Sequence, residues 1–291
     1  MKPVKTLFKG LLLGAAGAAF SLSGCKKKDK DDHDHSSSGS QPDSVWVEVM
    51  HEHPGNAHVY VYALLHRNQN GQVREGYNRF RIKVEGYNGT DVKLVPIMYM
   101  TNHSHSCPVQ QPDGRASDGY FYAEAFFQMP TTVQDGNVTE PWKLHVILNG
   151  RDTATAEVRI HPHPNGWVRR KMFGTDRLLY EFRPEGALRA TQIPVQVYLY
   201  RRDMNIPHED PAGFPPAFDR VDVVQLNTWM PSMNHGASGN QPATPIQGSF
   251  GFYKGQVGFN MTGEWEIYLA FVHQHGSHSD TLGMDTIRVS F

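Results

Sequence analysis

Short segments in which apolar and polar residues alternate run along most of the chain from Asp43 onward. In residues 79–85, Arg-Phe-Arg-Ile-Lys-Val-Glu, the apolar side chains fall on one face of an extended chain and the charged ones on the other. That alternation is typical of a half-buried antiparallel strand, and no stretch has the longer repeat of an amphipathic helix. The pattern therefore predicts an all-β protein. The predicted strands are residues 45–49, 58–65, 79–85, 92–98, 120–127, 142–148, 154–160, 167–173, 177–182, 193–200, 220–227, 249–259, 264–272 and 284–291.

The predicted strands fall into two groups, separated by His-Pro-His-Pro-Asn-Gly at residues 161–166. Two prolines and a glycine so close together interrupt a central strand. Each group holds seven strands in roughly 120 residues, as an immunoglobulin-like sandwich does. We therefore expect two tandem immunoglobulin-like β-sandwich domains, residues 43–162 and 163–291, with an irregular loop at 207–218.

The two halves also share an internal repeat. An ungapped comparison at an offset of 132 residues matches strand positions and an Asn-His pair that lies in a loop. Matches in strands follow from shared core packing, whereas the loop match indicates a duplicated sandwich. The pairs that carry this interpretation are Met98 with Met230, His103 with His235, Phe127 with Phe259, Met129 with Met261 and, after a nine-residue difference in a loop, Trp142 with Trp265.

The front of the chain has the pattern of a bacterial lipoprotein. Three lysines precede an apolar run at residues 11–20, and Leu-Ser-Gly-Cys follows, ending at Cys25. This predicts a signal peptide at 1–24, lipidation of Cys25 and attachment to a membrane through it. Residues 25–42 are polar after the cysteine and predict a flexible tether. Lys30-Asp31-Asp32 resembles an export signal, so we expect an outer-membrane lipoprotein on the periplasmic face or the cell surface.

Composition excludes several functions. The formal net charge of -1 provides no basic field for nucleic acid. With Cys25 lipidated, Cys107 has no partner for a disulfide, so the core must depend on apolar burial. No motif of a hydrolase, metalloprotease or phosphate-binding loop is present, and we expect no enzyme activity.

The most distinctive chemistry lies at residues 229–240, where Met230, Met233 and His235 follow one another closely. Two thioethers and an imidazole suit a soft copper(I) ion better than zinc, magnesium or calcium. The alternative is that the methionines only fill gaps in the core.

The same stretch carries a family resemblance. Trp-Met-Pro-Ser-Met-Asn-His-Gly at 229–236, the strand at 250–259 and Gly-Glu-Trp-Glu-Ile-Tyr-Leu at 263–269 are similar to YtkA-like or FixH-like domains, exported sandwiches near the copper carriers of CopC type. Residues 76–84 are similar to an earlier strand of that family. The resemblance implies copper handling or an accessory role, not catalysis. The first half departs from it, because Tyr99 and Thr101 stand at the positions that Pro231 and Met233 occupy in the second half.

Two further groups of soft or borderline ligands are candidates for copper. In the first half they could act as ligands or as packing residues, and a free thiolate would add strong affinity. In the last hairpin, His-x-His-x-x-His could join a site with His235 or be a polar turn. The candidates are Met98, Met100, His103, His105 and Cys107 in the first half, and His273, His275 and His278 in the hairpin. The remaining histidines are interpreted as scattered surface or loop residues: His51, His53, His58, His161, His163 and His208.

These observations favour an exported lipoprotein that binds copper through Met/His loops, as a carrier, a buffer or a delivery factor for a copper-receiving protein. The alternative is a surface-exposed β-sandwich module that binds a protein or glycan partner without metal.

Overall fold

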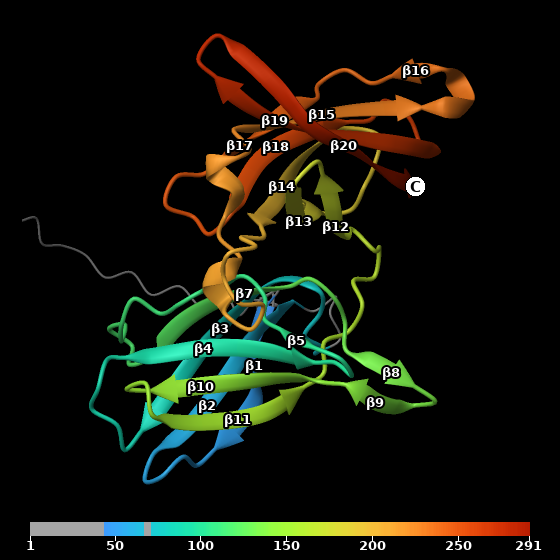
Figure 1. The fold of residues 1–291 in the computed structure, drawn as a ribbon. Helices are drawn as coiled ribbons and strands as arrows, with labels where there is room; N and C mark the ends of the chain where they lie inside the picture. Colours follow the sequence, from blue (N-terminus) through green and yellow to red (C-terminus); the bar gives the residue numbers. More distant parts are fainter. Residues whose placement is uncertain (1–43, 67–70) are drawn as a thin grey trace, which may run out of the picture. The chain divides into compact units, whose positions relative to one another are not determined.

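The computed structural model describes residues 44–66 and 71–291. Its elements are β-strands and three short 3-10 turns, so the predicted all-β class is confirmed (Figure 1). The turns are η2 (Pro211–Gly213), η3 (Ala217–Asp219) and η4 (Pro231–Met233). Within these described residues, no helix is long and apolar enough to cross a membrane. The predicted signal peptide, Cys25 and the tether lie outside the described residues.

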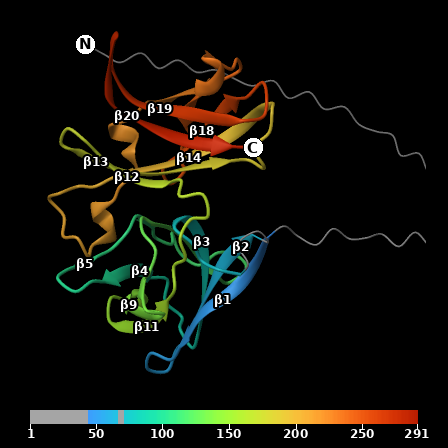
Figure 2. The ribbon, with the colours of Figure 1, turned by 90° about the vertical axis from the view of Figure 1, so that its right-hand side faces the viewer.

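The first half forms two antiparallel sheets that enclose one hydrophobic core (Figures 1 and 2). In spatial order the first sheet contains β1 (Ser44–Glu52), β2 (His58–His66), β3 (Gly76–Glu85), β7 (Phe121–Phe127) and β6 (Val109–Gln110). The second contains β11 (Asp152–Val158), β10 (Trp142–Leu148), β4 (Val92–Tyr99) and β5 (Ser104–His105). Beside them, β8 (Thr132–Gln134) and β9 (Asn137–Glu140) form a two-stranded hairpin.

The alternation seen in the sequence explains this packing. In β3, Phe80 and Ile82 are fully buried in the core, whereas Arg79 and Arg81 face away from it. Successive side chains of a strand point to opposite faces, so one strand supplies both a core layer and a polar surface. The burial of such apolar side chains stabilises the sandwich by about 25 cal/mol per Å² of apolar surface removed from water.

The second half forms a nine-stranded sheet that folds around a second core. Its spatial order is β12 (Val168–Phe173), β13 (Asp176–Pro184), β14 (Gln192–Arg201), β18 (Phe252–Gly258), β17 (Gln241–Pro245), β15 (Val223–Met230), β19 (Glu264–His275) and β20 (His278–Ser290), and β16 (His235–Gly236) pairs with β15. The strand β17 joins the two parts of the sheet, because it pairs with β18 and meets β15 through Ala243 and Val224.

Every strand predicted from the alternating pattern is present. The structure adds six strands of two to five residues, namely β5, β6, β8, β9, β16 and β17. Such pieces are too short to show a period in the sequence. The last hairpin is longer than predicted, since β19 continues to His275 and β20 begins at His278. Residues 207–218 form the expected irregular connection, with η2 inside it.

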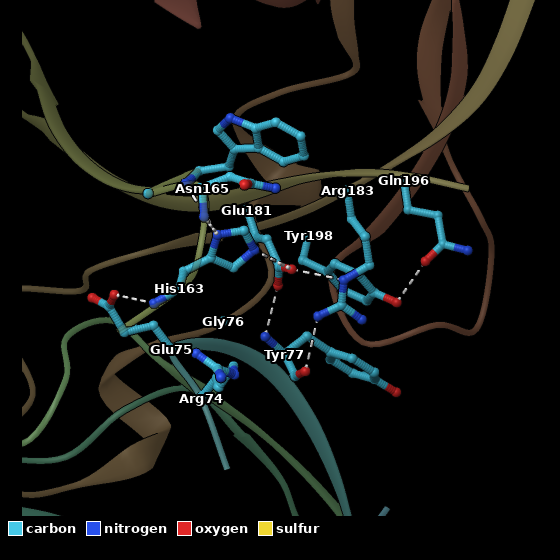
Figure 3. A network of polar contacts seen from close by, with 12 residues as sticks. Arg74, Glu75, Gly76, Tyr77, His163, Asn165, Glu181, Arg183, Gln196 and Tyr198 are labelled. Carbon is cyan, nitrogen blue, oxygen red and sulfur yellow. Dashed lines mark hydrogen bonds and ion pairs between the residues drawn. The ribbon is translucent and has the colours of Figure 1, made fainter. Parts of the chain in front are cut away.

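The described residues belong to one compact unit, and the two cores lie on either side of residues 161–166. A buried carboxylate joins the segments around this boundary (Figure 3). Glu181 is fully buried and accepts hydrogen bonds from the Tyr77 backbone N–H at 2.8 Å and from Arg183 Nε at 2.7 Å. A Cβ at Gly76, where φ is +95°, would lie 2.3 Å from this carboxylate. The close approach therefore requires glycine at that position.

Aromatic stacking also connects the segments around Glu181. The rings of Tyr77 and Tyr198 stack with their centroids 4.2 Å apart, and the Arg183 guanidinium lies 5.1 Å from the centroid of Tyr198. The arginine also donates to the Tyr77 carbonyl at 3.1 Å. The buried charge of Glu181 is therefore paired and hydrogen-bonded, which a buried carboxylate requires.

Candidate functional site

The predicted copper loop is a tight turn at the end of β15. Pro231 begins the 3-10 turn η4, and Asn234 ends it in the left-handed conformation with φ of 54°. The chain then reverses into β16, so that Met230 and His235 become cross-strand partners. Paired residues of antiparallel strands point to the same face. The turn therefore directs His235 toward the edge of the core that contains Met230.

The members of this loop differ in accessibility. Met230 belongs to the hydrophobic core, and its methyl group lies 3.0 Å from where a Cβ at Gly263 would be. Met233 is 59% exposed, and His235 is half-buried. The predicted set of three ligands is thus divided, because Met230 acts in packing while Met233 and His235 remain accessible to an ion.

A buried tryptophan supports His235. The imidazole meets the Trp265 ring edge to face, with centroids 5.9 Å apart, and the Trp265 indole N–H donates to the Met261 carbonyl at 3.1 Å. The Met261 side chain is 37% exposed. Asn260 Oδ1 lies 3.4 Å from His235 Nε2. We call Met230, His235, Met261 and Trp265 the second rim.

The first half contains the same arrangement. Met98 pairs with His105 across β4 and β5, and the His105 ring meets Trp142 edge to face with centroids 5.3 Å apart. The Trp142 indole N–H donates to the Met129 carbonyl at 3.2 Å. Met98, His105, Met129 and Trp142 form the first rim, which matches the second rim in these three contacts.

The structure corrects one pair of the sequence comparison. His105, not His103, stands at the position of His235, because each is the cross-strand partner of its rim methionine. His103 lies in the turn, is exposed, and its ring centroid is 6.3 Å from that of His105. The turn of the first half is two residues longer, and an ungapped alignment cannot register that difference.

The first rim is closed. His105 is buried, and its Nε2 lies 3.2 Å from Met129 Sδ, an imidazole and a thioether already in contact. Its Nδ1 lies 2.9 Å from the Ser106 carbonyl and 3.0 Å from Gln128 Nε2. Burial is the main cause that lowers the pKa of His105, so the ring is held neutral. Met100 is half-buried against the core, and its backbone N–H closes the turn.

Cys107 does not provide the predicted thiolate. The side chain is fully buried among apolar residues of the first core. Burial raises the pKa of the thiol well above its usual range, so the neutral, weakly reactive form persists. Cys107 is therefore a core residue, and the set predicted around it reduces to His105 with the neighbouring thioethers.

The histidines of the last hairpin lie apart from the second rim. His273 Nδ1 is 2.8 Å from Asp222, immediately before β15, whereas His235 pairs with Met230 at the other end of that strand (Figure 1). Eight residues of strand span about 25 Å. A joint site with His235 is therefore excluded. His275 and His278 pair across the turn, and His275 lies 3.7 Å from Asp280.

The structure gathers histidines that the sequence pattern left scattered. His51, His53 and His58 are exposed, and one ligand atom from each lies within 4.8 Å of the others. In the described part of the chain, this is the one group of three or more His, Cys, Asp or Glu ligands that meets this distance. His163, which was also interpreted as a loop residue, is largely buried beside Glu181.

Neither a protein-family model nor a curated protein matches this chain. The resemblance to YtkA-like or FixH-like domains therefore stays a prediction based on the residues of the 229–269 region.

Proposed function

We propose that the protein binds copper(I) at the second rim and serves in the cell envelope as a copper carrier, buffer or delivery factor. The proposed donors are His235, Met233 and Met261. All three are accessible, and they combine an imidazole with thioethers, the soft donor set that copper(I) prefers. The predicted anchor at Cys25, an outer-membrane location and a copper-receiving partner belong to this proposal.

One observation carries the proposal. In the first rim, the imidazole nitrogen of His105 and the sulfur of Met129 lie 3.2 Å apart, close enough for one ion to contact both. Met261 stands at the position of Met129, since each methionine carbonyl accepts the indole N–H of its rim tryptophan. The second rim shares the indole-to-carbonyl contact, and its imidazole and the Met261 side chain are accessible, which supports the proposal.

The scaffold restricts the backbone around these donors. Trp265 is almost fully buried and packs on Phe259 with centroids 5.4 Å apart, so the surface beneath His235 does not move freely. The left-handed Asn234 and Pro231 restrict the turn that carries Met233. Donors that are positioned before binding lose less conformational entropy on binding an ion.

Competition for copper(I) against a chromophoric chelator tests the proposal on the full chain. The variants Met233→Leu, His235→Ala and Met261→Leu should each weaken binding by at least about tenfold, which is 1.4 kcal/mol. Met284→Leu is the matched control, because Met284 is a 63% exposed thioether on β20. The proposal is wrong if the chain does not compete, or if the control lowers the affinity as much as the rim variants do.

A second candidate function is supported by the outer face of the first sheet. The Arg81 guanidinium lies 4.8 Å from the ring centroid of Trp46, 5.0 Å from that of Tyr62 and 4.4 Å from that of Tyr120. Buried Arg81 Nε has no hydrogen-bond partner. Aromatic rings with polar edges are frequent on surfaces that bind other molecules. This face suits a metal-free module for a glycan or protein.

A glycan panel probed with metal-free protein would test this second candidate. Tyr122 lies beside Trp46 at the edge of the aromatic cluster, with ring centroids 6.1 Å apart. Binding that is lost in Tyr122→Ala and kept in Tyr99→Ala, an exposed tyrosine of the other sheet, would favour it. Equal binding by both variants would count against this face.

A further inference from the structure

A bulge in β1 places His51 on the outer face of the first sheet. Glu48 pairs with Tyr62, but the next pairs are Met50 with Val61 and His51 with Tyr60. The extra residue reverses the alternation, so Met50 turns into the core and His51 turns outward. Bulges change the direction of side chains in this way and are frequent beside functional sites.

The turn between β1 and β2 is visible in Figure 2, and two more histidines flank it. His53 follows His51 by two residues in an extended segment, and His58 precedes Tyr60 by two. The centroid of the His53 ring lies 4.7 Å from that of His51 and 4.4 Å from that of His58. The three imidazoles therefore converge, with their ligand atoms within 4.8 Å of one another.

The hairpin that carries these rings is well fixed. The Ala57 backbone N–H donates to the Pro54 carbonyl at 3.1 Å, and Gly55 has φ of +58°. The turn also packs closely on the next connection, since a Cβ at Gly86 would lie 2.7 Å from the Asn56 carbonyl oxygen. The ring of Tyr60 stacks on His51 with centroids 4.1 Å apart. These contacts restrict the backbone and one of the three rings.

One carboxylate lies beside the histidines, and it is paired with a lysine. Glu85 is the cross-strand partner of His58 on the outer face of β3. Its carboxylate lies 2.5 Å from Lys83 Nζ, so it is held near the surface of the sheet. A carboxylate beside imidazole ligands is a common partner in metal sites, where it orients a ring or completes the coordination.

We propose that His51, His53 and His58 form a second metal site, for a divalent transition ion such as copper(II) or zinc(II). Three neutral imidazoles are borderline donors, which suit these ions, whereas calcium and magnesium require oxygen ligands. The site contains no thioether and therefore differs in chemistry from the copper(I) site of the second rim. Among divalent first-row ions, copper(II) should bind most tightly. This site does not depend on the proposed copper(I) function.

Titration of the full chain with Zn²⁺ and with Cu²⁺, in competition with a chelator, tests the site. The variants His51→Asn, His53→Asn and His58→Asn should each weaken the tightest site by at least about tenfold. The matched control is the double variant His275→Asn/His278→Asn, which removes two exposed histidines of a different hairpin turn. In pulsed EPR of the Cu²⁺-loaded chain, each site variant should reduce the imidazole couplings from three to two.

All three site histidines are exposed, so the melting temperature of the metal-free variants should stay near that of the wild type, and loss of binding then reports ligand loss. Unchanged affinity for both ions in the three variants would overturn the site. A decrease in the hairpin control as large as in the site variants would overturn it as well, because it would mark unspecific binding to surface histidines.

Discussion

The two rims are built alike and differ in access. In both, a methionine faces a histidine across a short hairpin, and a buried tryptophan lies beneath the imidazole. His105 of the first rim is buried and contacts Met129, Ser106 and Gln128. His235 of the second rim is half-buried, and Asn260 is the polar side chain beside it.

Comparing the two rims distinguishes contacts that the fold requires from side chains that are accessible to a ligand. The shared contacts describe what each core needs in order to close its edge, because they occur in both halves of the chain. The accessible imidazole of His235 and the exposed thioether of Met233 distinguish the second half, so they are not a requirement of the fold. Packing explains Met98 and Met230, and Met261 has a counterpart in Met129. Met233 is 59% exposed and has Thr101 at the matching position of the first half, and the proposed metal binding would give it a role.

The largest expected effect tests the shared part of the two rims. Trp142→Ala and Trp265→Ala should each reduce the free energy of unfolding by about 3–5 kcal/mol, because both remove a large buried ring and leave a cavity. Both side chains are almost completely buried. Chemical denaturation followed by circular dichroism measures this. A cost below about 1 kcal/mol for one of them would break the equivalence of the rims.

The next largest effect should distinguish the stability contributions of the two rim histidines. His105→Ala should lower the free energy of unfolding by about 2–3 kcal/mol, since it leaves buried polar groups of Ser106 and Gln128 without this partner. His235→Ala should cost less than about 1 kcal/mol, because its surroundings are open to water. The same denaturation experiment on the metal-free chain compares them. Equal costs would mean that the second rim is as structural as the first.

Oxidation should reveal the same difference in the methionines. Peroxide converts exposed methionine to the sulfoxide, and buried methionine reacts much more slowly. We expect Met233 and Met261 to react before Met98 and Met230, which are in the two cores. Peptide mass spectrometry gives the rates. Silver(I), a soft monovalent ion without redox chemistry here, should protect the first pair if they are ligands, while Met284 serves as the unprotected control.

The strands were predictable because they depend on the local alternation of apolar and polar residues, and identities at a fixed offset indicated that Met98 and Met230, and Trp142 and Trp265, occupy matching positions. The partner of each rim methionine was not predictable. That partner is set by hairpin register, and the two-residue difference between the turns moved the equivalent histidine from His103 to His105. A comparison without gaps keeps one offset and cannot follow such a change.

The cluster of His51, His53 and His58 could not be predicted from the sequence for a related reason. His51 is two residues from His53 but seven from His58, and only the bulge after Glu48 brings all three to one face. A strict period of two would have directed Met50 outward and His51 into the core. The His-x-His pair followed by a Pro-Gly turn and a third histidine was the available signal. Its meaning depends on a bulge that the residues alone do not specify.

The smallest expected effect concerns the segment that connects the rims' two cores. The side chain of His163 is 12% exposed and lies beside Glu181. Its Nδ1 accepts hydrogen bonds from the backbone N–H groups of Asn165 and Trp167 at 3.2 and 3.3 Å (Figure 3). Burial is the largest of the effects that lower the pKa of His163. Arg183, Arg74 and Arg169 lower it further, and Glu181 opposes them. Protonation would remove the acceptor that both backbone groups use.

Because the pKa is lower in the folded protein, the unfolded chain takes up this proton first as the pH falls. The contribution of His163 to stability should therefore be complete above pH of about 6.5 and decrease as the pH falls below it. Asn at this position can accept the same hydrogen bonds and does not titrate, so His163→Asn should show a shallower decline in unfolding free energy between pH 7 and pH 5. Other histidines contribute equally to both proteins. Identical pH profiles would show that the joint remains intact when His163 is protonated, and a change in His163 would then not affect how the two rims are connected.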